Sequence, residues 1–330
     1  MARGTIGIVG QGFVGVAVRE GMLHAFDVAA YDKKDNDVLL WQQKQYWKHG
    51  LCDLSCGVDP ISCEGSASVE RMKTLVSLCS TGIIFVCLPT PMKPDGSCDI
   101  SIVDAVVCQL DAAVELVTGG NGQKRFTVVI KSTVPPGTTE RLNQWCHNID
   151  VCFQPEFLTE ASACWDFKNQ NRIICGGVPE AVERVRAIYA TAYRMVPFRA
   201  MTSTAAELVK YFTNVALACR VSLANEFRQI AQALAEDYDA IIDAVKLDTR
   251  IGSSHWSVPG PDNHLGFGGS CFVKDLNALM YEAKELGIDP CVMEAVWKKN
   301  VEVRPERDWE QLVGRAVVCR VDSAAASESV

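Results

Sequence analysis

Three pairs of polar residues, each pair separated by one helical turn, are the features of this sequence best suited to chemistry. The members of a pair stand four positions apart, so they would share one face of a helix. The pairs are Glu156 with Glu160, Lys210 with Asn214, and Cys271 with Asp275. Two neighbouring carboxylates can raise the pKa of one of them and supply a general base. A thiol at a helix N-terminus has a lowered pKa and becomes a usable nucleophile.

Each pair also has a simpler interpretation. The carboxylate pair follows Pro155, which can begin a helical turn, and acids are favoured at such a solvated start. The lysine of the second pair lies in an apolar stretch and could pair with Glu207. The thiol of the third pair follows Ser270, a possible helix cap, but it is one of fifteen in the chain. The spacing alone leaves both interpretations of each pair open.

A glycine-rich segment near the N-terminus has the pattern of a dinucleotide-binding turn. Gly10, Gly12 and Gly15 follow a strand-like run at 5–9 and open a predicted helix. In this motif the glycines permit the tight turn, the approach of a pyrophosphate and close helix–strand packing. Asp32 stands where a carboxylate binds the adenosine ribose and favours NAD over NADP, although two lysines follow it directly. A packed strand–turn–helix without a ligand is the alternative.

The pattern of apolar residues around these motifs predicts a parallel sheet followed by helices. Short β-branched runs alternate with amphipathic stretches in the first half, which is typical of a doubly wound sheet. The runs lie at 5–9, 28–31, 83–88, 127–131, 151–153, 172–175 and 196–198. Residues 205–234 contain no proline or glycine and keep a helical apolar spacing. Shorter helices are expected at 239–247, 272–286 and 290–303, and a long loop at 252–269.

We therefore expect an α/β protein with an N-terminal doubly wound Rossmann domain at 1–200. An all-α domain built on the long central helix should follow at 201–306, and a remnant strand with a disordered tail at 307–330. The 330 residues are 48% hydrophobic, which excludes a disordered or fibrous chain. A net charge of −8 argues against a nucleic-acid partner, and no apolar run approaches the ~20 residues that span a membrane. Residues 1–10 resemble a short signal peptide superficially, but they run straight into the glycine motif and lack a cleavage pattern, so we interpret them as the first strand.

The cysteines favour a reducing compartment. Fifteen is an odd number, and several stand in apolar runs where a free thiol behaves as a small hydrophobe. Reduced thiols in the cytoplasm are therefore expected. Cys52, Cys56 and Cys63 lack the close pair of a zinc motif, so we expect no metal.

The pairs and the glycine turn fall inside a longer pattern that resembles the UDP-glucose/GDP-mannose dehydrogenase family, nucleotide-sugar dehydrogenases that oxidise an alcohol to a carboxylate. The resemblance runs from residue 7 to about residue 300 and comprises six blocks in the right order. They are Pro-Thr-Pro at 89–91, Lys-Ser-Thr-Val-Pro-Pro-Gly at 131–137, Pro-Glu-Phe-Leu-Thr-Glu at 155–160, Ala-Glu-Leu-Val-Lys-Tyr at 206–211, Asp-Thr-Arg-Ile-Gly at 248–252 and Gly-Phe-Gly-Gly-Ser-Cys-Phe-Val-Lys-Asp at 266–275.

The resemblance implies a two-step, four-electron oxidation that uses two NAD. The sugar C6 alcohol first becomes an aldehyde. Cys271 then attacks the aldehyde as a thiolate, and the thiohemiacetal loses a second hydride to become a thioester, which water hydrolyses to the acid. Lys210 and Asn214 would stabilise developing oxyanions. Asp275 and Thr133 would position water, and Glu156 is the candidate general base.

The resemblance also implies binding residues. For the cofactor these are Gly10, Gly12, Phe13, Val14, Gly15, Asp32, Thr90, Thr133 and Glu160. For the sugar they are Glu156, Phe157, Leu158, Lys210, Asn214, Arg250, Phe267 and Gly268. In the family the arginine of the fifth block reaches across a subunit interface, which implies a homodimer built through the long helix at 202–235.

The chain departs from the family pattern in several places. Gln154 stands where relatives have Asn, and Ala161 where they have Gly. The segment 250–266 is longer than usual. Full-length relatives carry a second Rossmann-like domain that holds the nucleotide, and residues 314–319 resemble only its opening strand. The base and the sugar of the substrate are therefore not identified by the sequence.

Two other functions compete with this interpretation. A two-electron β-hydroxyacid dehydrogenase-like enzyme shares the layout and the lysine–asparagine pair, but it has no equivalent of Cys271. A catalytically weak NAD-binding protein is the second alternative. The retained polar residues argue against it.

Overall fold

The computed structural model describes residues 3–35, 37–42, 65–120 and 126–319, with the backbone alone at 65–68. The chain divides into two compact units. Unit 1 comprises Met1–Thr90 and Ile100–Lys210, and unit 2 comprises Pro91–Asp99 and Tyr211–Val330. The boundary on the long helix lies between residues 210 and 211, ten residues beyond the expected division after residue 200. The first turns of the long helix are tied to unit 1 by their own hydrogen bonds, described below.

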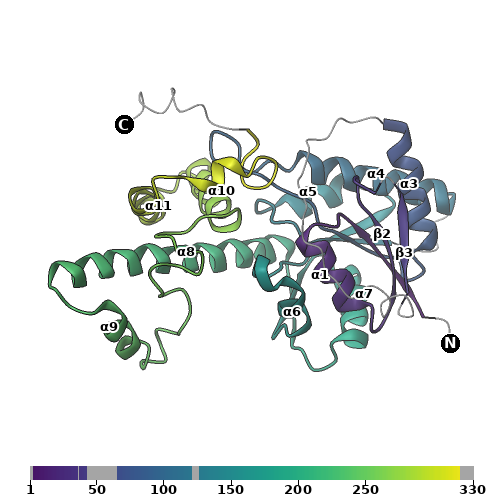
Figure 1. Cartoon of the computed structure of the whole chain (residues 1–330). Coiled ribbons are helices and arrows are strands. Elements are labelled where there is room, and N and C mark those ends of the chain that lie inside the picture. Colours follow the sequence, from purple (N-terminus) through teal and green to yellow (C-terminus); the bar gives the residue numbers. More distant parts are fainter. Residues whose placement is uncertain (1–2, 36, 43–64, 121–125, 320–330) are drawn as a thin grey trace. The chain divides into compact units, whose positions relative to one another are not determined.

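Unit 1 contains a mixed, mainly parallel sheet with helices on both faces (Figure 1), which confirms the expected Rossmann-like fold. The described strands run in the order β3-β2-β1-β4-β5-β6-β7-β8. Among the described strand pairs, only β2–β3 and β6–β7 are antiparallel. The strands are β1 (Thr5–Val9), β2 (Asp27–Tyr31), β3 (Val38–Trp41), β4 (Ile83–Val86), β5 (Phe126–Ile130), β6 (Ile149–Phe153), β7 (Ile173–Gly176) and β8 (Phe198–Met201).

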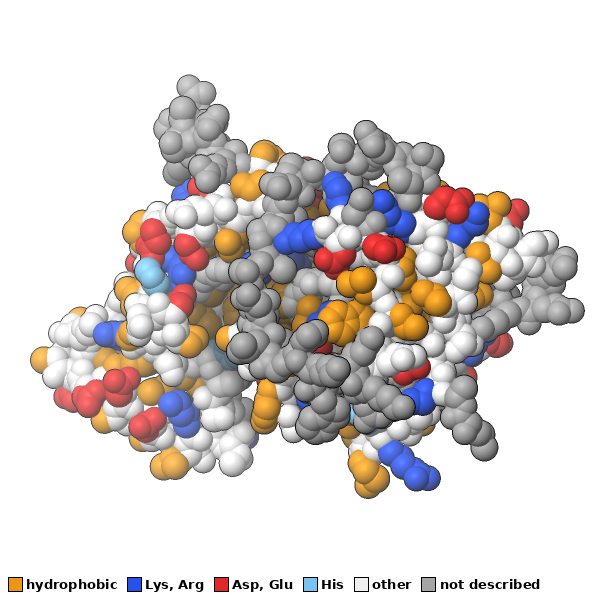
Figure 2. Space-filling view, turned by 45° about the vertical axis from the view of Figure 1, so that its right-hand side comes forward, with side chains coloured by type: hydrophobic (Ala, Val, Ile, Leu, Met, Phe, Trp, Pro, Cys, Tyr) orange, Lys and Arg blue, Asp and Glu red, His pale blue; other side chains and the backbone are white. Residues whose placement is uncertain are grey.

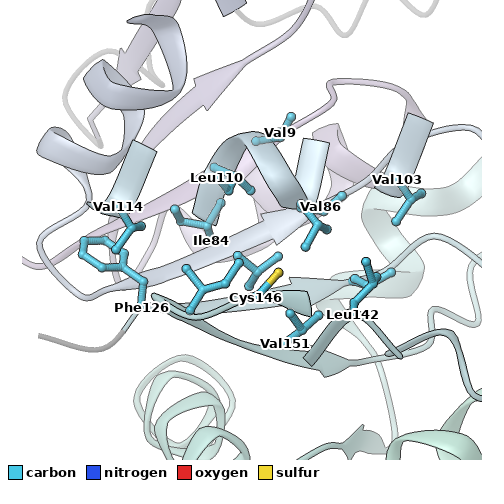
Figure 3. Close-up of a cluster of buried hydrophobic side chains, with 14 of the residues drawn as sticks. Val9, Ile84, Val86, Val103, Leu110, Val114, Phe126, Leu142, Cys146 and Val151 are labelled. Atoms are coloured by element: carbon cyan, nitrogen blue, oxygen red, sulfur yellow. The ribbon is translucent and has the colours of Figure 1, made fainter. Parts of the chain in front are cut away.

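Alternating side chains of each strand enter two separate cores. In β4, Ile84 and Val86 pack under α3, α4 and α5, as the close-up in Figure 3 shows for the α4 residue Leu110. Ile83 and Phe85 of the same strand face the opposite core, under α1, α6 and α7. This period of two is expected for strands buried on both faces. The helices are α1 (Phe13–Met22), α3 (Gly65–Leu78), α4 (Ser101–Thr118), α5 (Thr138–Trp145), α6 (Ala163–Lys168) and α7 (Pro179–Ala192).

Unit 2 is helical, as expected. The long helix α8 (Ser203–Ala233) enters it at Tyr211. Three shorter helices follow: α9 (Tyr238–Val245), α10 (Cys271–Glu285) and α11 (Cys291–Val303). Each begins or ends within two residues of its expected bounds. No helix among the described residues has the length and apolarity needed to cross a membrane.

The expected strand at 314–319 does not form. Gly314, with a positive φ, begins a turn between two isolated bridge residues, Val313 and Val317. The backbone of Met92 bonds this turn on both sides, accepting from Val318 and donating to Ala316. Ala316 and Val317 are buried in the unit 2 core. The apolar residues that looked like an opening strand therefore complete this core instead.

Candidate functional site

The glycine turn of unit 1 has the geometry of a dinucleotide cradle. Gly10 has φ +90° and follows β1 directly, and a Cβ there would lie 2.2 Å from the carbonyl oxygen of Cys87. A Cβ on Gly15 would lie 1.9 Å from the Gly10 oxygen. Both positions therefore require glycine for packing. Gly12, at the N-terminus of α1, has no atom within 4 Å of its Cβ position, so the space beside it is open to a ligand.

Asp32 lies beside this turn at the end of β2. Its carboxylate accepts hydrogen bonds from the backbone N–H of Gln11 at 2.6 Å and of Lys34 at 2.9 Å. The acid is thereby held against the glycine turn, where a ribose hydroxyl would approach it. Thr90 and Thr133, also expected at the cofactor, are buried and follow β4 and β5 at the carboxyl edge of the sheet. These residues fit NAD.

A buried ion pair connects Glu156 to the start of α8. The Lys210 ammonium donates to Glu156 Oε1 at 2.9 Å and to the Glu156 backbone oxygen at 2.8 Å. The second carboxylate oxygen accepts from the N–H of Leu158 at 2.7 Å. Both side chains are less than a tenth exposed. Phe157, on the same segment, lies with its ring 5.9 Å from the ammonium.

The helical turn that would place Glu156 and Glu160 on one face does not form. Residues 154–159 form no helical turn, Glu156 is buried, and Glu160 is exposed at the start of a short 3₁₀ helix. Burial by itself would raise the pKa of Glu156, but the Lys210 cation and the hydrogen bond from Leu158 outweigh it and lower the pKa. Glu156 is therefore ionised at neutral pH, and the raised pKa that one member of a carboxylate pair could have does not occur at Glu156.

Glu207 is not the partner of Lys210 either. Its fully buried carboxylate accepts from the N–H of Gly137 at 2.6 Å and from the N–H and hydroxyl of Thr139. It thus satisfies donors at the N-terminus of α5. This contact fastens the first turns of α8 to unit 1 and keeps Lys210 opposite Glu156.

A second cluster lies in unit 2 around the start of α10. Cys271 is the first residue of this helix and is half-buried. Ser270 occupies the cap position, but its side chain makes no capping hydrogen bond, which corrects that expectation. Asp275, one turn into the helix, is buried and accepts from Asn214 Nδ2 and from the Lys274 ammonium, both at 2.5 Å. Burial would lower the pKa of Lys274, but Asp275 and the nearby thiols raise it, so the cation persists beside Cys271.

Two residues that the sequence analysis missed hold the loop before Cys271. Asn300, fully buried on α11, bonds both the N–H and the C=O of Phe267, at 2.7 and 3.0 Å. Arg304 is buried between Asp308 and Asp262, and a Cβ on Gly268 would lie 2.3 Å from its guanidinium. Asn300 and Arg304 also stand four positions apart, so the spacing that singled out the other pairs could have found them.

The structure therefore groups the expected site residues within each unit. In unit 1 it brings together Glu156, Phe157 and Lys210; in unit 2, Cys271, Asp275 and Asn214. Arg250 is exposed and pairs with Asp248. Among the described residues no group of three or more His, Cys, Asp or Glu could hold a metal ion. The cysteines at 52, 56 and 63 lie outside the described residues.

Both units are similar to known proteins. Residues 4–193 match the NAD-binding domain of the UDP-glucose/GDP-mannose dehydrogenase family, and residues 204–302 match its central domain. A relative from Bacillus subtilis is 31% identical over 309 residues, 89% of this chain and 66% of its own length. The UDP-glucose 6-dehydrogenase of Pseudomonas aeruginosa is 34% identical over 235 residues, 68% of this chain and 49% of its own.

A solved structure agrees with these matches. The UDP-glucose dehydrogenase from the hyperthermophilic archaeon Pyrobaculum islandicum superimposes with a TM-score of 0.72 at 29% identity. The match covers 94% of this chain and 70% of the archaeal one. The chain thus spans about half to two thirds of the two curated relatives described above.

Proposed function

Because the chain belongs to the UDP-glucose/GDP-mannose dehydrogenase family, whose N-terminal domain binds NAD, we propose that it is a nucleotide-sugar 6-dehydrogenase. The observation that carries this proposal is the setting of Cys271. This thiol opens α10 and lies beside a buried Lys274–Asp275–Asn214 network. A two-electron dehydrogenase has no use for a nucleophilic thiol in this place.

The proposed reaction oxidises the sugar C6 twice. When bound, NAD accepts a hydride from C6 in each oxidation. In the first, the hydroxyl proton leaves as well and the alcohol becomes an aldehyde. The Cys271 thiolate then forms a carbon–sulfur bond to C6, and the oxygen takes a proton to give a thiohemiacetal. Loss of that proton and a second hydride leaves a thioester, and water cleaves it to the carboxylate and the free thiol.

We propose a separate role for each polar residue of the two clusters and for Thr133. Lys210, held as a cation by Glu156, is the proposed donor to the oxygen on C6, and Asn214 is the second donor. Asp275 and Thr133 are the proposed positioners of the hydrolytic water. Glu156 is the proposed general base. Because its pKa is lowered, it is a weak base and transfers the proton that it accepts to water.

We infer UDP-glucose as the first substrate to test, since the P. aeruginosa relative and the archaeal structure carry that name. Two NADH should form per UDP-glucose consumed, with UDP-glucuronate as product, because the thioester route removes four electrons. Absorbance at 340 nm and quantification of the remaining substrate give the ratio. A GDP-mannose arm run in parallel identifies the base and the sugar.

One NADH per substrate, with free aldehyde or ketone as product, would instead favour the β-hydroxyacid dehydrogenase alternative. A 3-hydroxyisobutyrate dehydrogenase from Mycobacterium tuberculosis shares the fold, with a TM-score of 0.64 at 15% identity. That likeness extends to the fold alone. NAD binding without turnover of either nucleotide sugar would favour the binding-protein alternative.

We also propose a homodimer through the long helix. Leu223, Phe227 and Ile230 are exposed at 4- and 3-residue spacing on α8, and Ile241 and Val245 are exposed on α9. An apolar stripe of this kind on a surface helix marks an interface, and a second copy of the chain is the proposed occupant. Phe227→Glu should shift the sedimentation coefficient from that of a dimer to that of a monomer. A wild-type monomer would contradict the proposal.

Two further inferences from the sequence remain predictions: that the chain has no nucleic-acid partner, and that it lies in the cytoplasm. On the face seen in Figure 2, Lys and Arg side chains are interspersed with Asp and Glu. None of the described cysteines forms a disulfide, in keeping with the cytoplasmic location expected from the sequence.

A further inference from the structure

Unit 1 contains a second buried lysine, Lys131, to which the proposed reaction assigns no role. It directly follows β5 and is 2% exposed. Its ammonium donates to the side-chain Oε1 of Gln154 at 3.2 Å and to the backbone oxygen of the same residue at 3.4 Å. The ring of Phe167 also lies close, 5.7 Å from the ammonium. A buried cation is costly unless it is hydrogen-bonded, so this ammonium is committed to Gln154.

Gln154 is the residue that ties Lys131 to the reaction. It directly follows β6, its N–H donates to Ile130, and it stands two residues before Glu156. Its Oε1 accepts a second hydrogen bond, at 2.8 Å, from the buried hydroxyl of Tyr189 on α7. Gln154 therefore fixes the segment before Glu156 through its side chain and through its backbone. Lys131 donates a hydrogen bond to each of them.

We propose that Lys131 is a positioning residue, whose ammonium holds Gln154 so that the Glu156 carboxylate stays aligned with Lys210. This inference rests on the proposed function, because Glu156 and Lys210 are the groups assigned to the oxygen on C6. Lys131 acts through Gln154 and through its charge, without touching the substrate. It is paired with this chain's glutamine, which replaces the asparagine expected from the family pattern.

The charge of Lys131 changes in a useful pH range. Burial lowers its pKa to about 8, against the smaller opposing effect of the nearby anionic groups. The titratable and charged groups that face it are Cys87, Cys175, Glu156 and Lys210. Burial raises the pKa of Cys87 to about 12, and the pKa of Cys175 is raised well above its usual value by its hydrogen bond with Cys152 and by burial. The pKa of Glu156 is lowered. Near pH 8 both thiols are thus protonated, Glu156 is ionised, and Lys131 changes charge.

The direction in which kcat changes with pH follows from these pKa shifts. Below about pH 8 Lys131 is an ammonium and makes charge-assisted hydrogen bonds; above it, the neutral amine donates weakly. The wild-type kcat should therefore fall as the pH rises through about 8. Lys131→Met, which fills the same volume without the charge, should have about a tenfold lower kcat at pH 7, a nearly unchanged KM for NAD, and no decline near pH 8.

Two further variants separate positioning from general packing. Gln154→Met removes the side-chain acceptor, makes the buried ammonium costlier, and should move the decline to lower pH. Tyr189→Phe removes the uncharged donor to the same oxygen and should leave the decline in place, with kcat within about twofold of wild type. Far-UV circular dichroism establishes that each variant folds. If Lys131→Met does not fold, the proposal is tested by Gln154→Met alone, through the pH at which its kcat declines.

The experiment is the pH profile of kcat from pH 6.5 to 9.5 for the four proteins, with UDP-glucose and saturating NAD. A wild-type profile that is flat near pH 8, a decline that persists in Lys131→Met, or a decline that vanishes in Tyr189→Phe overturns the proposal for Lys131. Absence of NADH formation by the wild type at every pH rejects the proposed function instead. The two failures are therefore distinguishable.

Discussion

Replacing Cys271 by serine should lower the rate of acid formation by about 10³-fold or more, because no thioester can form. The hydroxyl of serine is a far weaker nucleophile than a thiolate at neutral pH. The first oxidation does not need the thiol, so the variant should release about one NADH per substrate and accumulate the aldehyde. Trapping the product with a hydrazine and counting NADH checks both results. Acid formation at the wild-type rate would show that Cys271 is not the nucleophile.

The chain offers a matched control for this variant. Cys291 is also the first residue of a helix, α11, and its thiol is exposed. It differs from Cys271 in standing outside the Lys274–Asp275–Asn214 network. Cys291→Ser should therefore keep the wild-type rate and the ratio of two NADH per substrate. Equal losses in both variants would mean that a helix start alone accounts for the effect.

Lys210→Met should remove most of the activity and lower the free energy of unfolding by about 3–5 kcal/mol at pH 7. The reason is that Glu156 stays buried after its cation is gone. In the wild type the pKa of Glu156 is lowered, so its contribution to stability is present above the ordinary pKa of a glutamate and is lost as the pH falls. In the variant, burial without Lys210 raises that pKa instead. The destabilisation should therefore be largest at neutral pH and shrink as the pH falls and Glu156 takes up a proton.

Urea unfolding of wild type and variant at pH 7 and pH 5 measures this difference. Lys246→Met is the control, since Lys246 pairs with the largely exposed Asp243 at 3.0 Å on the surface of α9. Its loss should cost less than about 1 kcal/mol at either pH. If Lys210→Met is no more destabilising than Lys246→Met, or if its cost does not depend on pH, the buried ion pair does not contribute as described.

The fold was largely predictable because its signals are local and repeated. β-Branched runs, glycine spacing and an uninterrupted helical stretch each depend on a few neighbouring residues. The antiparallel strand β3 was missed because Leu39 and Leu40 are exposed and form no alternating pattern. The turn at Gly314 was missed because the apolar residues after it match a buried strand equally well. Only the unit 2 core decides between the two.

The site was predictable in its residue types and less so in its contacts. Spacing found Lys210, Asn214, Cys271 and Asp275, but it paired Glu156 with Glu160. The true partner stands more than fifty positions away along the chain, and no local pattern reports such a contact. Lys131 escaped notice for the same reason, since its importance depends on burial and on Gln154.

The contacts of Arg304 with Asp262 and Asp308 extend the packing of unit 2 beyond the part of the chain matched by the family's central domain. That match covers residues 204–302 and ends two residues before Arg304, whereas the superposition on the archaeal structure covers 94% of the chain. Yet Arg304, Trp309 and Val317 are among the most deeply buried residues of unit 2, and the arginine supports the loop that leads to Cys271. The packing that supports the loop before Cys271 therefore extends past residue 302, beyond the central-domain match.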